Sequence, residues 1–166
     1  MAQVYSVSFS SADSTAVIKD IFMITASTVS NFIVRELRIN QIAAALTSTA
    51  IELLSLTIYR GSSIASAGGA TATPVNVDSR SDATATFTTL VNSSTPGSSG
   101  AVAQLLYSSP WNTQLPFVWR PPKDERPVCK LSQRLQVRLG APGAAMVIGG
   151  SMIIEEIGKF PGGTAQ

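Results

Sequence analysis

The stretch QRLQVRL at positions 133–139 carries the clearest strand signal of the sequence. Its apolar residues Leu135, Val137 and Leu139 alternate with Arg and Gln, so apolar and polar side chains fall on opposite sides of an extended chain. Because successive side chains of a β-strand point to opposite faces, this period of 2 predicts a half-buried strand. Its polar face is expected to meet water or a partner.

The same alternation recurs along the chain. It places Tyr5, Val7 and Phe9 on one face of an N-terminal strand, whereas the segment 16–26 is apolar on both faces and is expected to be covered on both. Proline and glycine separate the segments, and about eight strands are predicted. The other strand candidates are 31–40, 53–60, 83–91, 101–107, 115–119, 130–139 and 147–157.

Two low-charge runs of Gly, Ser, Ala and Thr, at 61–74 and 92–100, predict long surface loops. Many short strands without alternating helices indicate an all-β fold, a single-domain antiparallel β-sandwich or jelly roll spanning residues 1–166. We expect the Gly-rich end, 159–166, to form a flexible C-terminal tail. Strand order does not follow from periodicity.

Two local features leave alternatives open. The segment 41–54, rich in Ala and Leu, is compatible with a short helix as well as with loop and strand. Arg35 interrupts the alternation of its strand, which suits either an inward-pointing charge that protects an edge strand or a contact across a subunit interface.

Composition excludes several classes of function. The chain has no histidine, which removes the commonest general base and metal ligand, and its lone cysteine, Cys129, is expected to be core packing rather than a nucleophile. Lys and Arg outnumber Asp and Glu by only 12 to 10, too evenly for a surface that grips nucleic acid. No segment has the length of a membrane span or the pattern of a signal peptide, so we expect a soluble protein that contacts no membrane.

No motif for catalysis, cofactor binding or metal binding is found. The neighbouring acids Asp124 with Glu125, and Glu155 with Glu156, would point to opposite faces of a strand and are interpreted as solvated surface. Asp78 and a second acid, Asp82, lack the ligand spacing of a calcium loop and are interpreted as turn residues. We therefore expect no catalytic residues, no cofactor and no metal.

The segment 108–130 has the composition of a contact surface. It gathers both tryptophans, several prolines and a cluster of Arg and Lys, residue types that are enriched at the centres of interfaces or hold the backbone extended. Alternatively, its aromatic residues plug the ends of the sandwich, or they join the basic residues in binding single-stranded nucleic acid. The candidate interface residues are Trp111, Phe117, Trp119, Arg120 and Arg126.

The order of the segments resembles a family of small proteins from the head modules of tailed bacteriophages. The matching pieces are the start Met1–Phe9, the turn LTIYRGSS at 56–63, the loop ending in Thr73-Pro74 and a closing strand that ends in acids. The Gly-rich end of the chain departs from the family pattern. The resemblance implies a jelly-roll decoration or cement protein without catalytic residues.

For function, the resemblance implies a viral structural protein on the outer capsid surface of the virion, assembled in the host cytoplasm. Its implied partners are the major capsid protein and further copies of itself, as a homotrimer, with no nucleic acid. The alternative is a receptor- or carbohydrate-binding β-sandwich module of a phage tail or fibre, with Trp111 or Trp119 as the platform on which a sugar stacks.

Overall fold

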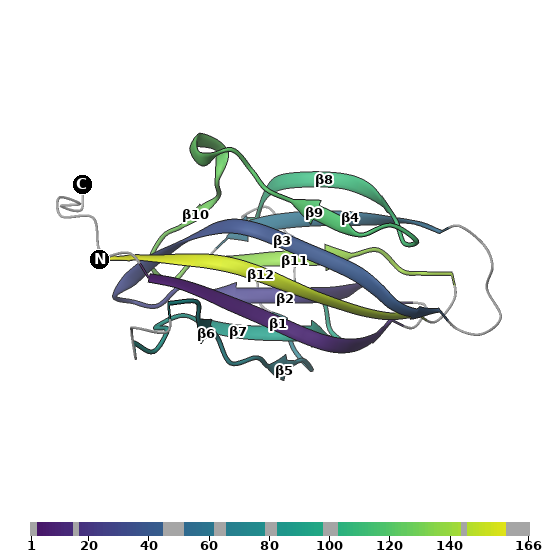
Figure 1. The fold of residues 1–166 in the computed structure, drawn as a ribbon, viewed down its shortest axis with the longest axis horizontal. Coiled ribbons are helices and arrows are strands. Elements are labelled where there is room, and N and C mark those ends of the chain that lie inside the picture. Colours follow the sequence, from purple (N-terminus) through teal and green to yellow (C-terminus); the bar gives the residue numbers. More distant parts are fainter. Residues whose placement is uncertain are drawn as a thin grey trace.

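The protein is an antiparallel β-sandwich, seen in a computed structural model that describes residues 3–14, 17–44, 52–61, 66–78, 83–97, 103–143 and 146–158. Its strands and one 3₁₀ turn are shown in Figure 1. They are β1 Gln3–Ser14, β2 Lys19–Thr25, β3 Ser30–Ala44, β4 Leu53–Gly61, β5 Ala70–Thr71, β6 Val75–Asn76, β7 Thr88–Ser93, β8 Gln104–Asn112, β9 Phe117–Trp119, η1 Lys123–Glu125, β10 Val128–Cys129, β11 Arg134–Leu139 and β12 Met146–Gly158.

Two sheets pack face to face. The first, sheet A, has the order β10-β3-β12-β1-β6, with β9 also paired to β3, and lies in front in Figure 1. The second, sheet B, has the order β5-β7-β2-β11-β4-β8. All described pairings are antiparallel, which confirms the predicted all-β sandwich.

The long strands pair in a nested order. The first strand, β1, pairs with the last, β12; β2 pairs with β11; β3 pairs with β9 and β10; and β4 pairs with β8. This is the order of a long hairpin rolled up so that successive pairs fall in alternate sheets, which defines a jelly roll. An insertion between β4 and β8 adds β5 and β7 to sheet B and β6 to sheet A.

The core lies between the sheets and follows the predicted alternation. Tyr5 and Val7 are fully buried, and Phe9 packs edge-on against Phe22 of β2, with ring centroids 5.1 Å apart. In β11 the three alternating residues of the QRLQVRL stretch are all fully buried. The expectation that its polar face meets water or a partner is wrong at Gln136, which is also fully buried. Burial of such side chains is the main source of stability, at about 1.5–3 kcal/mol each.

Strand β2 is buried on both faces, as predicted, whereas Val17 and Ile18 of the predicted segment precede the strand and are exposed. Phe22 and Ile24 belong to the core between the sheets, while Met23 lies on the outer side beneath the inserted segment, where its sulfur accepts a hydrogen bond from the Ser66 backbone N–H at 3.2 Å. The predicted loop 61–74 is therefore only partly a surface loop, since it contains β5 and the buried Ser66. Residues 62–65 lie outside the described ones.

The structure corrects the interpretation of Arg35 as an edge-strand charge. Its strand β3 lies between β12 and the β9 and β10 strands, so it is not an edge. The residue falls where the pairing register shifts, and its Nε lies 2.8 Å from the Glu155 carboxylate. The alternative helix at 41–54 is not seen in the described part, where β3 continues to residue 44 and β4 begins at 53; residues 45–51 lie outside it.

Candidate interaction surface

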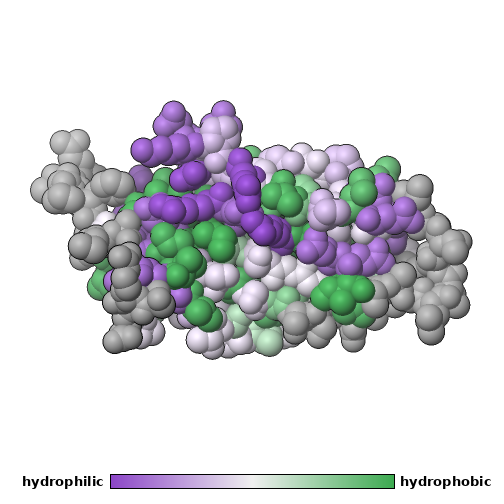
Figure 2. Space-filling view, in the orientation of Figure 1, coloured by the Kyte–Doolittle hydropathy of each residue, from purple (hydrophilic) through white to green (hydrophobic). Residues whose placement is uncertain are grey.

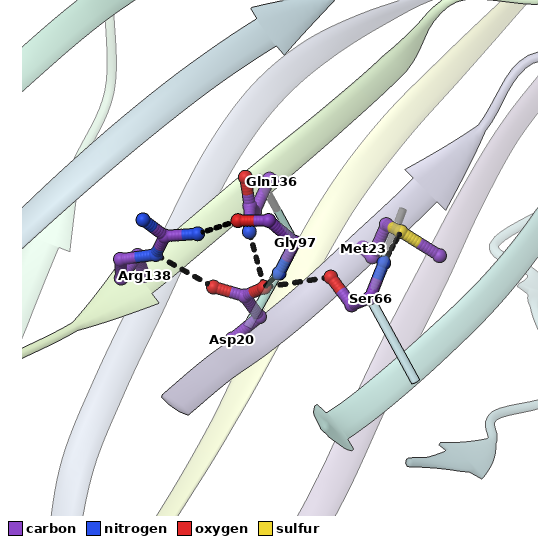
Figure 3. A network of polar contacts seen from close by, with 6 residues as sticks. All are labelled: Asp20, Met23, Ser66, Gly97, Gln136 and Arg138. Carbon is purple, nitrogen blue, oxygen red and sulfur yellow. Dashed lines mark hydrogen bonds and ion pairs between the residues drawn. The ribbon is translucent and has the colours of Figure 1, made fainter. Parts of the chain in front are cut away.

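The densest polar cluster of the described residues surrounds Asp20 of β2 (Figure 3). Its carboxylate, fully buried, accepts hydrogen bonds from the Ser66 hydroxyl and the Gly97 N–H, both at 2.6 Å, and from Arg138 Nε at 3.0 Å. The Gln136 amide is a further donor. Because donors surround the carboxylate and solvent does not reach it, the cluster fastens two loops to sheet B and offers no chemical site.

A second buried acid, Glu156, closes one end of the sandwich. Its carboxylate accepts hydrogen bonds from the hydroxyls of Ser30 and Thr86 and from the Thr86 N–H at 3.3 Å. Its neighbour Glu155 lies on the outer face with Arg35. The prediction that these acids point to opposite faces is confirmed. Their interpretation as solvated surface is wrong for the buried Glu156, whereas Glu155 lies partly exposed in an ion pair on the outer face.

The other acids lie at the surface. Asp124 and Glu125 are exposed on the 3₁₀ turn, as predicted. At Asp78 the backbone N–H donates to the Asn76 side-chain oxygen at 2.9 Å, which is the predicted turn chemistry, whereas Asp82 lies outside the described residues. No three side chains of the types that bind metals cluster in the described part of the chain.

Trp111 is a core residue. It is 3% exposed, and its indole N–H donates to the Leu115 carbonyl at 2.7 Å, which fastens the turn after β8. Trp111 was predicted either as an interface residue or as a core residue that closes the end of the sandwich, and its burial supports the second. It is removed from the candidate interface because a partner cannot reach its ring.

Phe117 and Trp119 lie together where the two sheets meet at one side. Both are half-buried on β9, and both rings contact Tyr107 of β8 in the other sheet, at centroid distances of 6.2 and 5.5 Å. Tyr107 was not among the predicted interface residues, although its position in a predicted strand before the aromatic segment was a usable signal. Val118, which lies between these two residues in the chain, faces outward and is 52% exposed.

Arg120 extends this aromatic side with positive charge. Its Nε lies 3.0 Å from the Glu36 carboxylate, which also contacts Arg38 of the same strand. The hydrogen bond from Arg120 is the main cause that holds the pKa of Glu36 below its usual value of 4.5. The arginine side chains remain 61% and 51% exposed, so both guanidinium groups are accessible to a partner.

Arg126 lies beyond the projecting segment that carries η1 (Figure 1, top). It is half-buried, and its Nε is enclosed without a hydrogen-bond partner among the described residues. The next residue, Pro127, accepts a hydrogen bond from the Val34 N–H at 3.2 Å, which anchors the segment on β3. Of the predicted interface residues, Phe117, Trp119 and Arg120 thus lie consecutively along one side, with Arg126 at the far end of the projection.

Shallow hollows adjoin this side. One of 530 Å³ is lined by Asn40 to Ile42 and by 113–116, the turn between β8 and β9. Another of 340 Å³ lies on the outer face of sheet A, where Arg38, Ile42 and Gly149 are among the residues that line it. Both are open to solvent, which suits side chains of a partner better than an enclosed small ligand.

Comparisons with known proteins give little. No protein-family model matches the chain, and no curated protein matches it. A chain of the T13 IBDV viral particle resembles it in structure at 12% sequence identity and a TM-score of 0.23, over 95% of this chain. The chain spans 40% of the length of that protein, and a likeness of this strength carries no argument about function. None of the described helices is long and apolar enough to cross a membrane.

Proposed function

We propose that this chain is a structural head protein of a tailed bacteriophage, which binds the outer capsid surface and stabilises the junctions between capsomers. The observation that carries the proposal is one side of the jelly roll, where the exposed Val118 and Arg120 lie beside the half-buried rings of Phe117 and Trp119. By contrast, the polar groups clustered around Asp20 are buried and hydrogen-bonded to one another. Side chains suited to contact with a partner are therefore available on this side, whereas the Asp20 cluster is occupied within the fold.

Fold alone does not decide this function, because jelly rolls occur in viral capsid proteins, lectins and cupins. The resemblance of the order of its sequence segments to that of phage head proteins supports the capsid role. In the proposed assembly the major capsid protein is the partner, the chain acts as a homotrimer, and no cofactor, metal, nucleic acid or membrane takes part. Three linked binding sites convert weak contacts into strong attachment.

The receptor- or carbohydrate-binding alternative needs an exposed aromatic ring on which a sugar stacks. Burial of Trp111 removes one of its two candidate platforms, and Trp119 is half-buried against Tyr107. This alternative is therefore less well supported than the capsid role.

The test uses undecorated shells assembled from the major capsid protein of the same phage. Purified protein is mixed with the shells, the shells are pelleted, and bound copies are counted as the protein concentration rises. Saturable binding at a multiple of three per facet, with shells that resist heat better, is expected. If the protein stays in the supernatant at every salt concentration and temperature, the proposed capsid role is wrong. The next experiment is then a screen for glycan binding by the wild-type protein and by Trp119→Ala.

A further inference from the structure

The two outer faces of the jelly roll differ in how they are covered. On sheet B, the segments around Ser66 and Gly97 lie over the strands, so that Asp20, Met23 and Gln136 are buried although they point away from the core. On sheet A, the described outward-facing residues of the long strands β1 and β3 keep at least partial exposure, apart from Asn31 near the start of β3. Sheet A is the side that faces the viewer in Figures 1 and 2.

Aliphatic side chains cluster on this open face. Register places Ser6 beside both Val75 and Ile153, and in the next row Glu155 lies beside both Val4 and Ile33. Figure 2 shows the resulting hydrophobic patches, interrupted by a hydrophilic band. A high β-propensity explains one outward valine or isoleucine, but not their recurrence on the four neighbouring strands β6, β1, β12 and β3. Such a patch on a soluble protein indicates a contact site.

The charge presented by this face is positive. Arg35, Arg38 and Arg120 have side chains 38%, 51% and 61% exposed, whereas the acids that they pair with, Glu36 and Glu155, are only 14% and 15% exposed. The carboxylates therefore lie beneath the guanidinium groups. Each guanidinium carries five N–H donors in a planar fork, so donors remain for carboxylates of a partner.

The size of the face suits a protein partner. Strands lie about 4.8 Å apart and rise about 3.3 Å per residue, so the long strands β1, β3 and β12, of 12, 15 and 13 residues, cover together with the short β6, β9 and β10 roughly 750 Å². A stable protein interface covers roughly 800 Å² on each partner. Aliphatic side chains have no complement on a nucleic acid backbone, which leaves a protein surface as the best match.

We infer that the outer face of sheet A is the docking face of the molecule, and that its occupant is a protein surface of aliphatic side chains interspersed with carboxylates. This inference rests on the proposed function, under which that surface belongs to the capsid shell. Val118, Arg38 and Arg120 mark one border of the face and Val75 marks the other.

The test blocks each outer face after folding. Ser8 is exposed on the outer face of sheet A, where its pairing partner Ser151 also pairs with Arg38, and Ser108 is exposed on the outer face of sheet B. Ser8→Cys and the matched control Ser108→Cys are each labelled with a polyethylene glycol maleimide. The native Cys129 is fully buried, which keeps the label on the new thiol. Labelled Ser8→Cys is expected to bind shells at least tenfold more weakly than labelled Ser108→Cys.

A second set of variants tests the chemistry of the face. Val75→Asp and Val118→Asp place a carboxylate at residues that are 63% and 52% exposed, and Leu105→Asp does so at a 56% exposed residue of sheet B. Loss of shell binding is expected for the first two alone. Arg38→Ala is expected to weaken binding and to reduce its dependence on salt, because one screened charge contact is lost.

The outcomes separate the two proposals. If the wild-type protein binds shells and the Ser8 label leaves binding unchanged, the docking face is wrong and the capsid role stands. The docking face is also wrong if both labels abolish binding equally. If the wild-type protein binds no shells, the capsid role fails and the inference falls with it.

Discussion

Asp20 illustrates how this chain uses its few charged residues. A buried carboxylate is costly unless hydrogen bonds compensate it, and here Ser66, Gly97, Gln136 and Arg138 all donate to it. Replacement by Ala would leave these donors, including a guanidinium that is 15% exposed, without their acceptor. We expect Asp20→Ala to lower the free energy of unfolding by about 3–5 kcal/mol, measured by urea denaturation.

Asp124→Ala is the matched control, because that carboxylate is exposed on η1. Its effect is expected to stay within about 0.5 kcal/mol. Equal unfolding free energies for Asp20→Ala and the wild-type protein would show that the network contributes nothing net to stability.

Cys129 is expected to be chemically silent in the folded protein. It is fully buried, and burial raises the pKa of its thiol from 9.0 to about 12, so the reactive thiolate is scarce. At pH 8 we expect no reaction with Ellman's reagent until urea unfolds the chain. Rapid reaction in native buffer would contradict this burial.

The raised pKa of Cys129 also predicts the direction of a pH effect. Above pH 9 the unfolded chain loses the thiol proton while the folded chain keeps it, so the free energy of unfolding falls as pH rises from 9 towards 12. Cys129→Ala lacks this proton, and the stability advantage of the wild-type protein over it is expected to shrink across that range. An unchanged difference in urea denaturation would count against the raised pKa.

For single residues, the sequence predicted which face of a strand a side chain lies on better than it predicted which residues surround that side chain. Alternation placed Glu155 and Glu156 on opposite faces, which was right, because parity is a local property of an extended chain. It could not show that Ser30 and Thr86, from distant segments, surround Glu156, nor that Arg35 covers Glu155. Burial of Trp111 depends in the same way on packing between sheets.

At the element scale, β12 depends on close approach to its neighbours. A Cβ on Gly150 would lie 2.7 Å from the Arg38 carbonyl oxygen of β3, and backbone cannot move aside cheaply. On Gly149 the nearest atom, at 2.5 Å, is the flexible end of the Ile42 side chain. We expect Gly150→Ala to destabilise by about 1–3 kcal/mol and Gly149→Ala by less, as measured by thermal or urea unfolding.

Gly158→Ala is the control, since no described atom lies within 4 Å of its added Cβ. A smaller loss for Gly150→Ala than for Gly149→Ala would mean that the β3 and β12 backbones are farther apart than described.

Long strands were predictable and short ones were not. The segments of β1, β2, β3, β4, β11 and β12 carry enough alternating or continuous apolar residues to stand out. The inserted strands β5 and β6 have two residues each, too few for any period, and their places are set by pairing with β7 and β1. For this reason the prediction treated most of the insertion as loop.

At the scale of the whole molecule, the nested pairing makes nearly every strand depend on a distant one. β1 pairs with β12, so the two ends of the described chain must meet before the centre of sheet A exists. Periodicity identifies strands but carries no information on which strands pair, and this is why strand order was beyond the sequence. The strand order also affects folding, because closing a loop between distant segments costs entropy that is recovered only when the strand contacts form.

This topology predicts slow folding. Domains dominated by pairings between distant residues fold in roughly milliseconds to seconds, whereas helical bundles fold in microseconds to milliseconds. We expect the main refolding phase in stopped-flow dilution from urea to fall in the slower range. Trp119→Phe leaves Trp111 as the only tryptophan, and its buried indole reports when β8 closes onto the core.

Proline isomerisation adds separate phases of roughly 10–100 s, and a prolyl isomerase accelerates those alone, so the main phase can be identified. Trp111 pairs with Leu54 of β4, which is distant in the chain, so its native fluorescence requires a long-range contact. If it appeared within microseconds, the slow folding expected from this topology would be contradicted.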